Sequence, residues 1–213
     1  MQMLLSSHRN SVAGHANLIK RTDCGILLHT AGFPTSGILE VHRMESLCMP
    51  DLDYLLDDSV SCPEYPFTKT FDQAKHLPCM VIHTSGSTGM PKPVVWTHWH
   101  FTTSDTQNHV PDMDGRPSIW GGVTSTARRV YPGIPVFHGA GIVTGIVEII
   151  YTGSTMVLGL PGLPTPDDLV QMIEYGRIDS AVCFPLTLEE VATRSDVLGQ
   201  LHRLKHITFT GGT

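Results

Sequence analysis

The stretch His83-Thr84-Ser85-Gly86-Ser87-Thr88-Gly89-Met90-Pro91-Lys92 decides how the rest of the chain is interpreted. Apolar runs flank it on both sides, Met80-Val81-Ile82 before it and Val94-Val95-Trp96 after it. Glycine allows positive φ and a close approach of the backbone to a ligand, and successive backbone N–H groups in such a turn form a concave site for anions. The hydroxyl groups add donors, and Lys92 adds a mobile positive charge. The pattern predicts a phosphate-binding loop between two strands.

The composition describes a globular chain with a substantial core. Of its 213 residues, 41% are hydrophobic and 16% are charged, and the net charge is −6. The negative balance and the scattered Lys and Arg residues argue against nucleic acid as the main partner. The five cysteines are irregularly spaced without a Cys-x-x-Cys pair, so we expect neither a disulfide framework nor a zinc site but buried free thiols.

The chain shows no targeting or membrane-spanning pattern. Its first residues lack the charged and apolar regions of a signal peptide. The longest apolar window, 140–150, is too short to span a bilayer and contains Glu148. We therefore expect a cytoplasmic protein without a membrane partner.

Helical and strand-like segments alternate along the chain, which is typical of α/β proteins with a largely parallel sheet. We expect strands at 25–29, 79–96 around the loop, 130–137, 154–158, 180–184 and 206–210, and helices at 10–22, 35–44, 51–56, 97–108, 141–151, 165–176 and 187–193. Residues 57–77 and 109–127 are expected to be connections.

Three helices carry further signals. The 141–151 helix is expected to be buried except at Glu148 and to be closed by Gly153. Thr165-Pro166-Asp167-Asp168 and Thr187-Leu188-Glu189-Glu190 both have the pattern of a capping box at a helix start.

Two common phosphate-loop patterns do not fit. A Walker loop needs a lysine directly after its second glycine, followed by a hydroxyl residue, whereas Lys92 here follows Pro91 and precedes Pro93. A dinucleotide fingerprint needs G-x-G-x-x-G, but Gly139-Ala140-Gly141 is followed by Thr144 where the third glycine should stand. Those two glycines are better interpreted as close packing at a helix start.

Thr84–Lys92 resembles, over nine consecutive positions, the signature loop of the adenylate-forming superfamily. That superfamily comprises acyl-CoA synthetases, luciferases and nonribosomal peptide synthetase adenylation domains. Further likenesses follow in the same order: the strand and turn at 95–98, the aromatic/His segment at 135–139 and the strand-Gly-Gly turn at 209–213. Residues 8–27 near the start of the chain resemble fungal synthetase-like adenylating reductases.

The resemblance implies the large N-terminal subdomain of an adenylate-forming enzyme, with a mostly parallel sheet and flanking helices. It implies that a carboxylate attacks the α-phosphorus of ATP bound with Mg²⁺, and that the acyl group is then transferred to CoA or to a phosphopantetheine carrier. It also implies carrier and reductase domains of a larger parent protein as partners. Lys92 would neutralise developing charge as the catalytic residue, and His138 and Gly139 would line the acid pocket. The implied nucleotide-binding residues are Thr84, Ser85, Gly86, Ser87, Thr88, Gly89, Lys92, Gly211, Gly212 and Thr213.

Ordinary structural roles compete with some of these assignments. His138 is equally well interpreted as a buried histidine that a backbone group satisfies. His98 and His100 lack a third ligand at suitable spacing, so we expect no protein metal site. Asp167 and Asp168 fit a helix start better than a catalytic pair.

The match to the superfamily is partial. The chain is expected to be an adenylation domain truncated at both ends, because the later Tyr-Gly-x-Thr-Glu turn, the ribose-binding Asp and the C-terminal lid with its lysine have no counterpart in it. Two hypotheses follow. The chain is part of a carboxylic-acid adenylating enzyme and is inactive alone, or it is a non-catalytic remnant that serves as a nucleotide-binding or interaction module.

Overall fold

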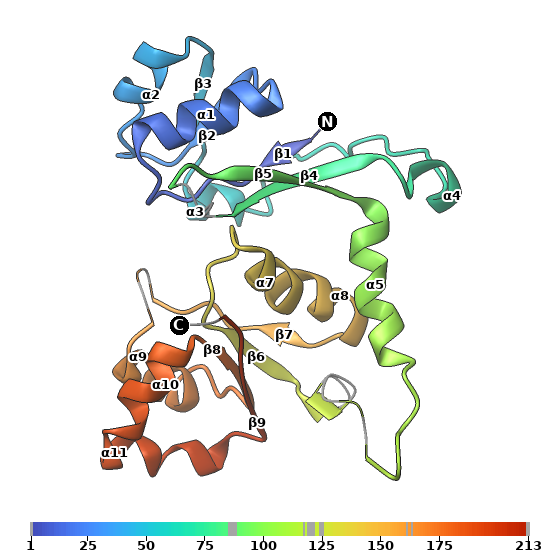
Figure 1. Ribbon diagram of the computed structural model, residues 1–213, viewed down its shortest axis with the longest axis vertical. Helices are drawn as coiled ribbons and strands as arrows, with labels where there is room; N and C mark the ends of the chain where they lie inside the picture. Colours follow the sequence, from blue (N-terminus) through green and yellow to red (C-terminus); the bar gives the residue numbers. More distant parts are fainter. Residues whose placement is uncertain are drawn as a thin grey trace. The chain divides into compact units, whose positions relative to one another are not determined.

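The computed structural model describes residues 2–84, 89–116, 118, 122–123, 126–160, 162 and 164–211, and the side chains of all of these except 107 and 108. The chain divides into two compact units, Met1–His98 and Trp99–Thr213, and each is described here by itself. The α/β class that the sequence predicts is confirmed in both (Figure 1).

The first unit is built around the hairpin of β4 (Pro78–Thr84) and β5 (Lys92–Thr97), which pair antiparallel. A short strand that the sequence did not reveal, β1 (Met3–Leu4), lies parallel to β4 on its other side. Its two residues are too few to show an alternating pattern, because a period of two needs four or more positions.

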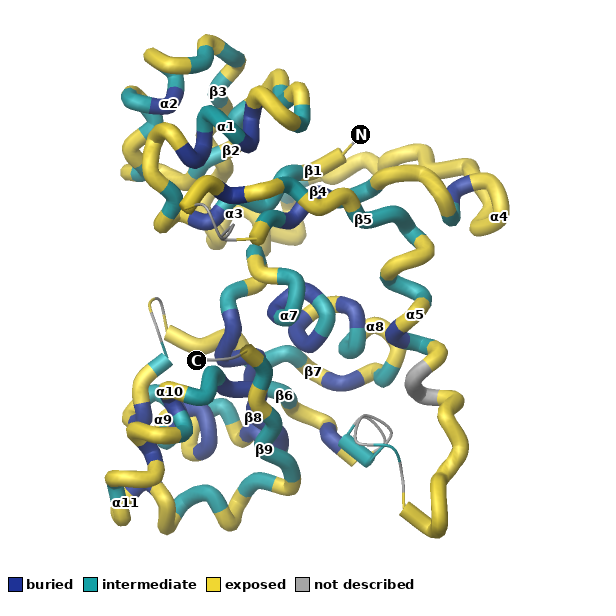
Figure 2. The backbone as a smooth tube through the Cα atoms, in the orientation of Figure 1, coloured by how far each residue is buried: buried dark blue, intermediate teal, exposed yellow. Residues whose placement is uncertain are grey.

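Helix α1 (Val12–Thr22) ends where the sequence predicts and begins two residues later than the predicted range of 10–22. Ser11 caps it by accepting a hydrogen bond from Gly14 N–H at 3.1 Å, which satisfies one of the free donors of the first turn. Leu18 and Ile19 are almost completely buried on its inner face (Figure 2).

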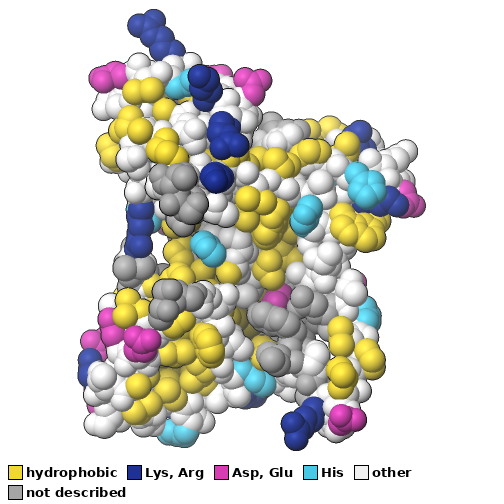
Figure 3. All heavy atoms as spheres, in the orientation of Figure 1, with side chains coloured by type: hydrophobic (Ala, Val, Ile, Leu, Met, Phe, Trp, Pro, Cys, Tyr) yellow, Lys and Arg dark blue, Asp and Glu magenta, His cyan; other side chains and the backbone are white. Residues whose placement is uncertain are grey.

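The remaining elements of the first unit are short. The parallel pair β2 (Ile26–His29) and β3 (Glu45–Cys48) forms a separate two-stranded sheet, and β3 was not predicted. Helices α2 (Ser36–Val41) and α3 (Leu52–Leu55) are shorter than expected, and α4 (Phe71–Ala74) lies within the predicted connection. Large apolar side chains stay exposed here, including Ile26 and Leu28 of β2, and Figure 3 shows hydrophobic groups at the surface.

The second unit begins with α5 (His98–Asn108), whose first residue ends the first unit. Its sheet has the order β7-β6-β8-β9 and is parallel throughout. The strands are β6 (Arg129–Pro132), β7 (Thr155–Met156), β8 (Ser180–Cys183) and β9 (His206–Phe209). The central strand β8 is buried at every position.

Helices cover both faces of this sheet (Figure 1). Ala181 and Cys183 of β8 pack against α9 (Pro166–Glu174), α10 (Pro185–Ala192) and α11 (Ser195–Leu198). Side chains alternate along a strand, so Ser180 and Val182 face the other layer, where they line a small cavity with residues of α8. A single turn of 3-10 helix, η2 (Leu201–Arg203), leads into β9.

The helix predicted at 141–151 is present but differs in structure and burial. It consists of α7 (Gly139–Ile142), a π-helical segment η1 (Val143–Val147) and α8 (Glu148–Thr152), and it ends at Gly153 with φ +66° as expected. The prediction of burial at all positions except Glu148 is wrong: Ile150 is 73% exposed, and Glu148 itself is partly buried. The π segment changes the angular spacing of the side chains, which a regular helical pattern does not anticipate.

One predicted capping box is confirmed and the other is wrong. Thr165 and Asp168 make the reciprocal bonds at the start of α9, with the Asp168 carboxylate accepting from Thr165 N–H at 2.8 Å. Helix α10 instead begins at Pro185, because proline is favoured at the first position of a helix. Thr187 therefore lies inside that helix and donates to the carbonyl of Pro164 at 3.4 Å.

The five thiols are free, but the expectation that they are buried holds only for Cys183. Cys48 and Cys62 are exposed, and Cys24 and Cys79 are partly exposed. Within the described ranges, the helices are all too short or too polar to cross a bilayer.

Candidate functional site

The predicted phosphate-binding stretch connects β4 to β5. Thr84, the last residue of β4, pairs with Lys92, the first residue of β5. Ser85, Gly86, Ser87 and Thr88 lie outside the described residues. Gly89 has φ +79°, a conformation that glycine adopts without the penalty other residues carry. The register thus brings the two ends of the predicted loop side by side.

Lys92 presents its charge at the end of this hairpin. Its side chain is exposed, and no described residue forms an ion pair or hydrogen bond with its Nζ. Two other lysines, Lys75 and Lys205, instead form ion pairs with carboxylates. A lysine without a carboxylate partner at a loop end can neutralise a phosphate group as a point charge.

A set of polar contacts supports the residues on either side of the loop. His83 Nε2 accepts hydrogen bonds from Ser7 N–H at 3.0 Å and from Asn10 Nδ2 at 3.3 Å. Asn17 Nδ2 donates to the carbonyl of Pro91 at 2.9 Å. Nearby, His15 Nδ1 bonds to Ser6 Oγ at 2.9 Å, and burial, followed by the proximity of His83, lowers the pKa of His15. The contacts of His83 and Pro91 join positions more than seventy residues apart, so the sequence alone does not reveal these partners.

The remaining predicted site residues lie in the second unit. Gly211 follows β9 with φ +107°, and a Cβ there would lie 3.9 Å from Pro185, the first residue of α10. Gly211 is therefore at the carboxyl edge of the parallel sheet, where ligands bind in open α/β folds. Gly212 and Thr213 lie outside the described residues.

His138 begins the helix next to Gly139. Its Nδ1 accepts from Ala140 N–H at 3.3 Å, so a backbone group does satisfy it. The residue is nevertheless exposed, and the interpretation as a buried histidine is wrong in that respect. Gly141, which follows in the same turn, packs so closely that a Cβ would lie 2.2 Å from the carbonyl oxygen of Pro135. The expected close packing at this helix start is thus confirmed.

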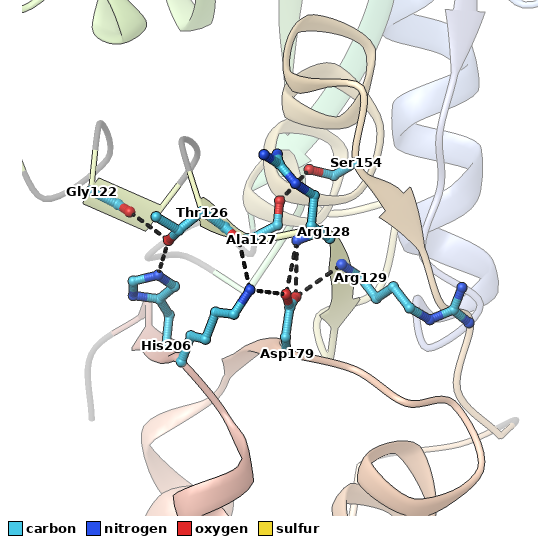
Figure 4. Close-up of polar contacts among 9 residues, drawn as sticks. Gly122, Thr126, Ala127, Arg128, Arg129, Ser154, Asp179 and His206 are labelled. Atoms are coloured by element: carbon cyan, nitrogen blue, oxygen red, sulfur yellow. Dashed lines mark hydrogen bonds and ion pairs between the residues drawn. The ribbon is translucent and has the colours of Figure 1, made fainter.

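Asp179, which the sequence analysis did not single out, joins the amino ends of three strands (Figure 4). Its carboxylate accepts hydrogen bonds from the backbone N–H groups of Arg128 and Arg129, both at 2.9 Å, and from Lys205 Nζ at 2.9 Å. Burial raises the pKa of Asp179, but the bonds from Arg129, Lys205 and Arg128 outweigh it, so the pKa lies below its usual value.

Replacing Asp179 with alanine should lower the free energy of unfolding by about 3 kcal/mol at pH 7, because it leaves two backbone donors without their acceptor and removes the ion pair with Lys205, whose ammonium group keeps only the Thr126 carbonyl. A carboxyl whose pKa is depressed by folding stabilises the fold above its unfolded pKa, and this contribution disappears as the pH falls through the folded pKa. The difference between the two proteins in urea unfolding should therefore shrink below about pH 4. Asp72→Ala, at an exposed ion pair with Lys75, is the control and should change little. Equal effects of both substitutions would contradict this role.

Glu148 lies beside a cavity of about 10 Å³ in the second unit, close to the space that one water needs. Ser180, which is completely buried, also lines it, and its Oγ has no hydrogen-bond partner among the described residues. Burial raises the pKa of Glu148 to about 7. A carboxyl that is hard to ionise thus faces the sheet from α8.

The pH dependence of stability should reveal this carboxyl. Between pH 4.5 and 7 the folded chain holds a proton on Glu148 that the unfolded chain has lost, so stability falls as the pH rises through this window. We expect a loss of about 2 kcal/mol, less than the full shift implies because the carboxyl keeps some contact with water. Glu148→Gln, which cannot ionise, should abolish that loss in urea unfolding at pH 5 and pH 8. The same pH dependence in both proteins would contradict the assignment.

The sequence model of the AMP-binding enzyme family matches residues 10–213. The chain belongs to the AMP-binding enzyme family. The family match includes the Thr84–Lys92 stretch and every other predicted site residue.

Fungal proteins are among the relatives of this AMP-binding chain. A carboxylic acid reductase from Neurospora crassa is 30% identical over 98% of the chain, and an isocyanide synthase–nonribosomal peptide synthetase hybrid from Aspergillus fumigatus is 32% identical over 98%. The chain spans 20% and 14% of the lengths of these relatives, respectively. The resemblance to fungal adenylating enzymes is confirmed.

Solved structures confirm the fold. The N-terminal domain of FACL13 from Mycobacterium tuberculosis superposes with a TM-score of 0.75 at 15% identity, covering 99% of this chain and 50% of that one. The O-succinylbenzoate coenzyme A synthetase of Bacillus subtilis, in complex with ATP and magnesium, gives a TM-score of 0.68 at 16% identity and covers 99% of this chain and 39% of that one. The AMP-binding chain thus has the fold of the N-terminal region of these enzymes.

Proposed function

We propose that this chain is the part of a carboxylic-acid adenylating enzyme that grips the pyrophosphate portion of ATP. The observation that carries the proposal is Lys92, whose exposed side chain, unpaired among the described residues, begins β5 directly opposite Thr84. Membership in the AMP-binding family supports acid adenylation as the general chemistry. The identity of the acid is left to experiment.

The residues at this hairpin fit a polyphosphate. Gly89 has a positive φ, and a Cβ placed there would meet no atom of the described residues within 4 Å, which fits a backbone that a ligand can approach. Lys92 supplies the charge, and the hydroxyl of Thr84 lies at the paired position across the hairpin. Mg²⁺ would come with ATP and neutralise part of the phosphate charge.

The proposed reaction has two steps. A carboxylate oxygen attacks the α-phosphorus of ATP, the bond to the bridging oxygen of the β-phosphate breaks, and pyrophosphate leaves with that oxygen. Lys92 would offset the charge that accumulates on the departing pyrophosphate, a form of electrostatic catalysis that depends on fixed position. A thiol of CoA or of a phosphopantetheine carrier then attacks the acyl carbon and releases AMP.

We assign the activity to a larger protein that contains this chain together with acceptor domains. The small share of the fungal relatives that the chain spans supports this, and the Neurospora relative is a carboxylic acid reductase. His138 and Gly139 are proposed to line the acid pocket, and Gly211, Gly212 and Thr213 to contact the nucleotide or the acid. We propose that the 213-residue chain alone is inactive.

Trapping with hydroxylamine tests the proposal. The complete protein is incubated with ATP, Mg²⁺ and a panel of aliphatic and aromatic acids, and acyl hydroxamates are measured together with pyrophosphate. Formation of both in equal amounts with at least one class of acid is the expected result. If ATP binds but no acid in the panel yields pyrophosphate, the non-catalytic nucleotide-binding alternative takes its place.

A further inference from the structure

The two ends of the Thr84–Lys92 stretch are attached to the same short segment of the N-terminal region. His83 directly precedes Thr84 and is bonded by Ser7 and Asn10. Pro91 directly precedes Lys92 and is bonded by Asn17. We propose that Ser7, Asn10 and Asn17 form a polar clamp that positions the loop for the polyphosphate of ATP; this rests on the proposed function of the loop.

The first half of the clamp replaces a strand contact. Leu5 N–H bonds to the carbonyl of Val81 at 2.9 Å, so a continued parallel ladder would bring Ser7 N–H to the carbonyl of His83. Ser7 N–H donates to His83 Nε2 instead. The backbone after the N-terminal strand therefore bonds to the side chain of His83, the residue that directly precedes the loop.

These contacts determine the state of the His83 ring. A backbone N–H can only donate, so Nε2 must be the accepting nitrogen and the proton of the neutral ring lies on Nδ1. Nδ1 is buried and has no hydrogen-bond partner among the described residues. A buried donor without an acceptor costs about 1–3 kcal/mol. A buried polar atom without a partner among the described residues needs an explanation, and a role in positioning the adjacent loop supplies one.

The second half of the clamp holds the other end of the loop to α1. Pro91 is buried, and its ring packs against Gly14, where a Cβ would lie 3.4 Å from Pro91 Cγ and Cδ. Asn17, one turn further along α1, donates to the Pro91 carbonyl. Because a carbonyl oxygen only accepts, the orientation of the Asn17 amide is fixed by this bond.

The clamp makes α1 and the segment before it a positioning element for catalysis. Its three residues contact His83 and Pro91, which directly precede Thr84 and Lys92 in the sequence. Thr84 and Lys92 pair across the hairpin, so a displacement of either end changes the separation of the groups that would grip the phosphates. A misplacement of about 1 Å can cost on the order of a hundredfold in rate.

Two substitutions of His83 separate positioning from simple packing. His83→Leu removes the acceptor of Ser7 N–H at similar size, whereas His83→Gln places an amide oxygen close to the position of Nε2 and can still accept. In the full chain, amide hydrogen exchange of Ser7 should accelerate about tenfold or more in His83→Leu and stay within about twofold of wild type in His83→Gln.

Kinetics of the complete protein supply the second measurement. In ATP–pyrophosphate exchange, His83→Leu and Asn17→Ala should raise the KM for ATP about fivefold or more while the KM for the acid stays unchanged, and His83→Gln should restore the KM for ATP. Lys20→Ala, at an exposed position of the same helix, is the control and should match wild type. A general loss of folding would change both KM values together.

These measurements can distinguish a failure of the clamp proposal from a failure of the proposed function. If wild type shows no exchange activity, the function fails, and hydrogen exchange at Ser7 still decides whether the contacts form a clamp. If His83→Leu does not fold, Asn17→Ala and His83→Gln carry the test. Unchanged Ser7 exchange and an unchanged KM for ATP in these variants would overturn the clamp.

Discussion

Replacing Lys92 with alanine is expected to lower carboxylate-dependent ATP–pyrophosphate exchange by the complete protein about 100-fold, the usual effect of removing one preorganised group that stabilises developing charge. The reason is its position: the ammonium group begins β5 opposite Thr84, is exposed, and has no carboxylate partner among the described residues. A charge that stabilises nothing within the fold can be removed without unfolding it. The free energy of unfolding should therefore change by less than about 0.5 kcal/mol.

Two further lysine variants complete that experiment. Lys92→Arg keeps the charge but changes its shape and should retain part of the activity. Lys69→Ala, at an exposed position in the connection before α4, should leave both activity and stability unchanged. Wild-type activity in Lys92→Ala would contradict the assignment of this residue to the leaving pyrophosphate.

Replacing Gly141 with alanine is expected to lower the free energy of unfolding by about 3 kcal/mol. A Cβ at this position would lie 2.2 Å from the Pro135 carbonyl oxygen and 2.8 Å from that of Ile134, and both are backbone atoms that cannot rotate away. Alanine favours a helix over glycine by only about 1 kcal/mol. The steric clash therefore outweighs the gain in helix propensity.

Urea unfolding of the full chain measures this effect, with Gly25→Ala as the matched control. No atom of the described residues lies within 4 Å of a Cβ at Gly25, and its φ is not positive, so that substitution should be close to neutral. If Gly141→Ala were as stable as Gly25→Ala, the backbone of residues 134–135 could move aside without loss of stability. That result would contradict the role of close packing at the start of α7.

The local patterns of the sequence predicted most helices and the longer strands. The cap at Thr165 and the glycine at 153 are local signals, and the structure confirms both. Strand β1 was missed because two residues carry too little pattern, and β3 because Glu45-Ser46-Leu47-Cys48 contains no continuous apolar run. The start of α10 was misplaced because Pro185 and Thr187 both signal a helix start, and only packing against Pro164 decides between them.

The candidate site was predictable to the extent that its residues are contiguous. Thr84–Lys92 was recognisable because one stretch carries glycines, hydroxyls and a lysine together. The residues that support it were not, because Ser7 and Asn17 become neighbours of His83 and Pro91 only through the fold. Asp179 was missed for the same reason, since its partners come from segments 50 and 26 residues away in sequence.

Oxygen labelling tests the central claim most directly. The complete protein is given an active acid with ¹⁸O in both carboxylate oxygens, ATP, Mg²⁺ and hydroxylamine, and the nucleotide product is analysed by mass spectrometry. Attack on the α-phosphorus followed by cleavage of the acyl–oxygen bond predicts AMP that carries one ¹⁸O. Unlabelled AMP, or ADP with the label in inorganic phosphate, would contradict adenylation.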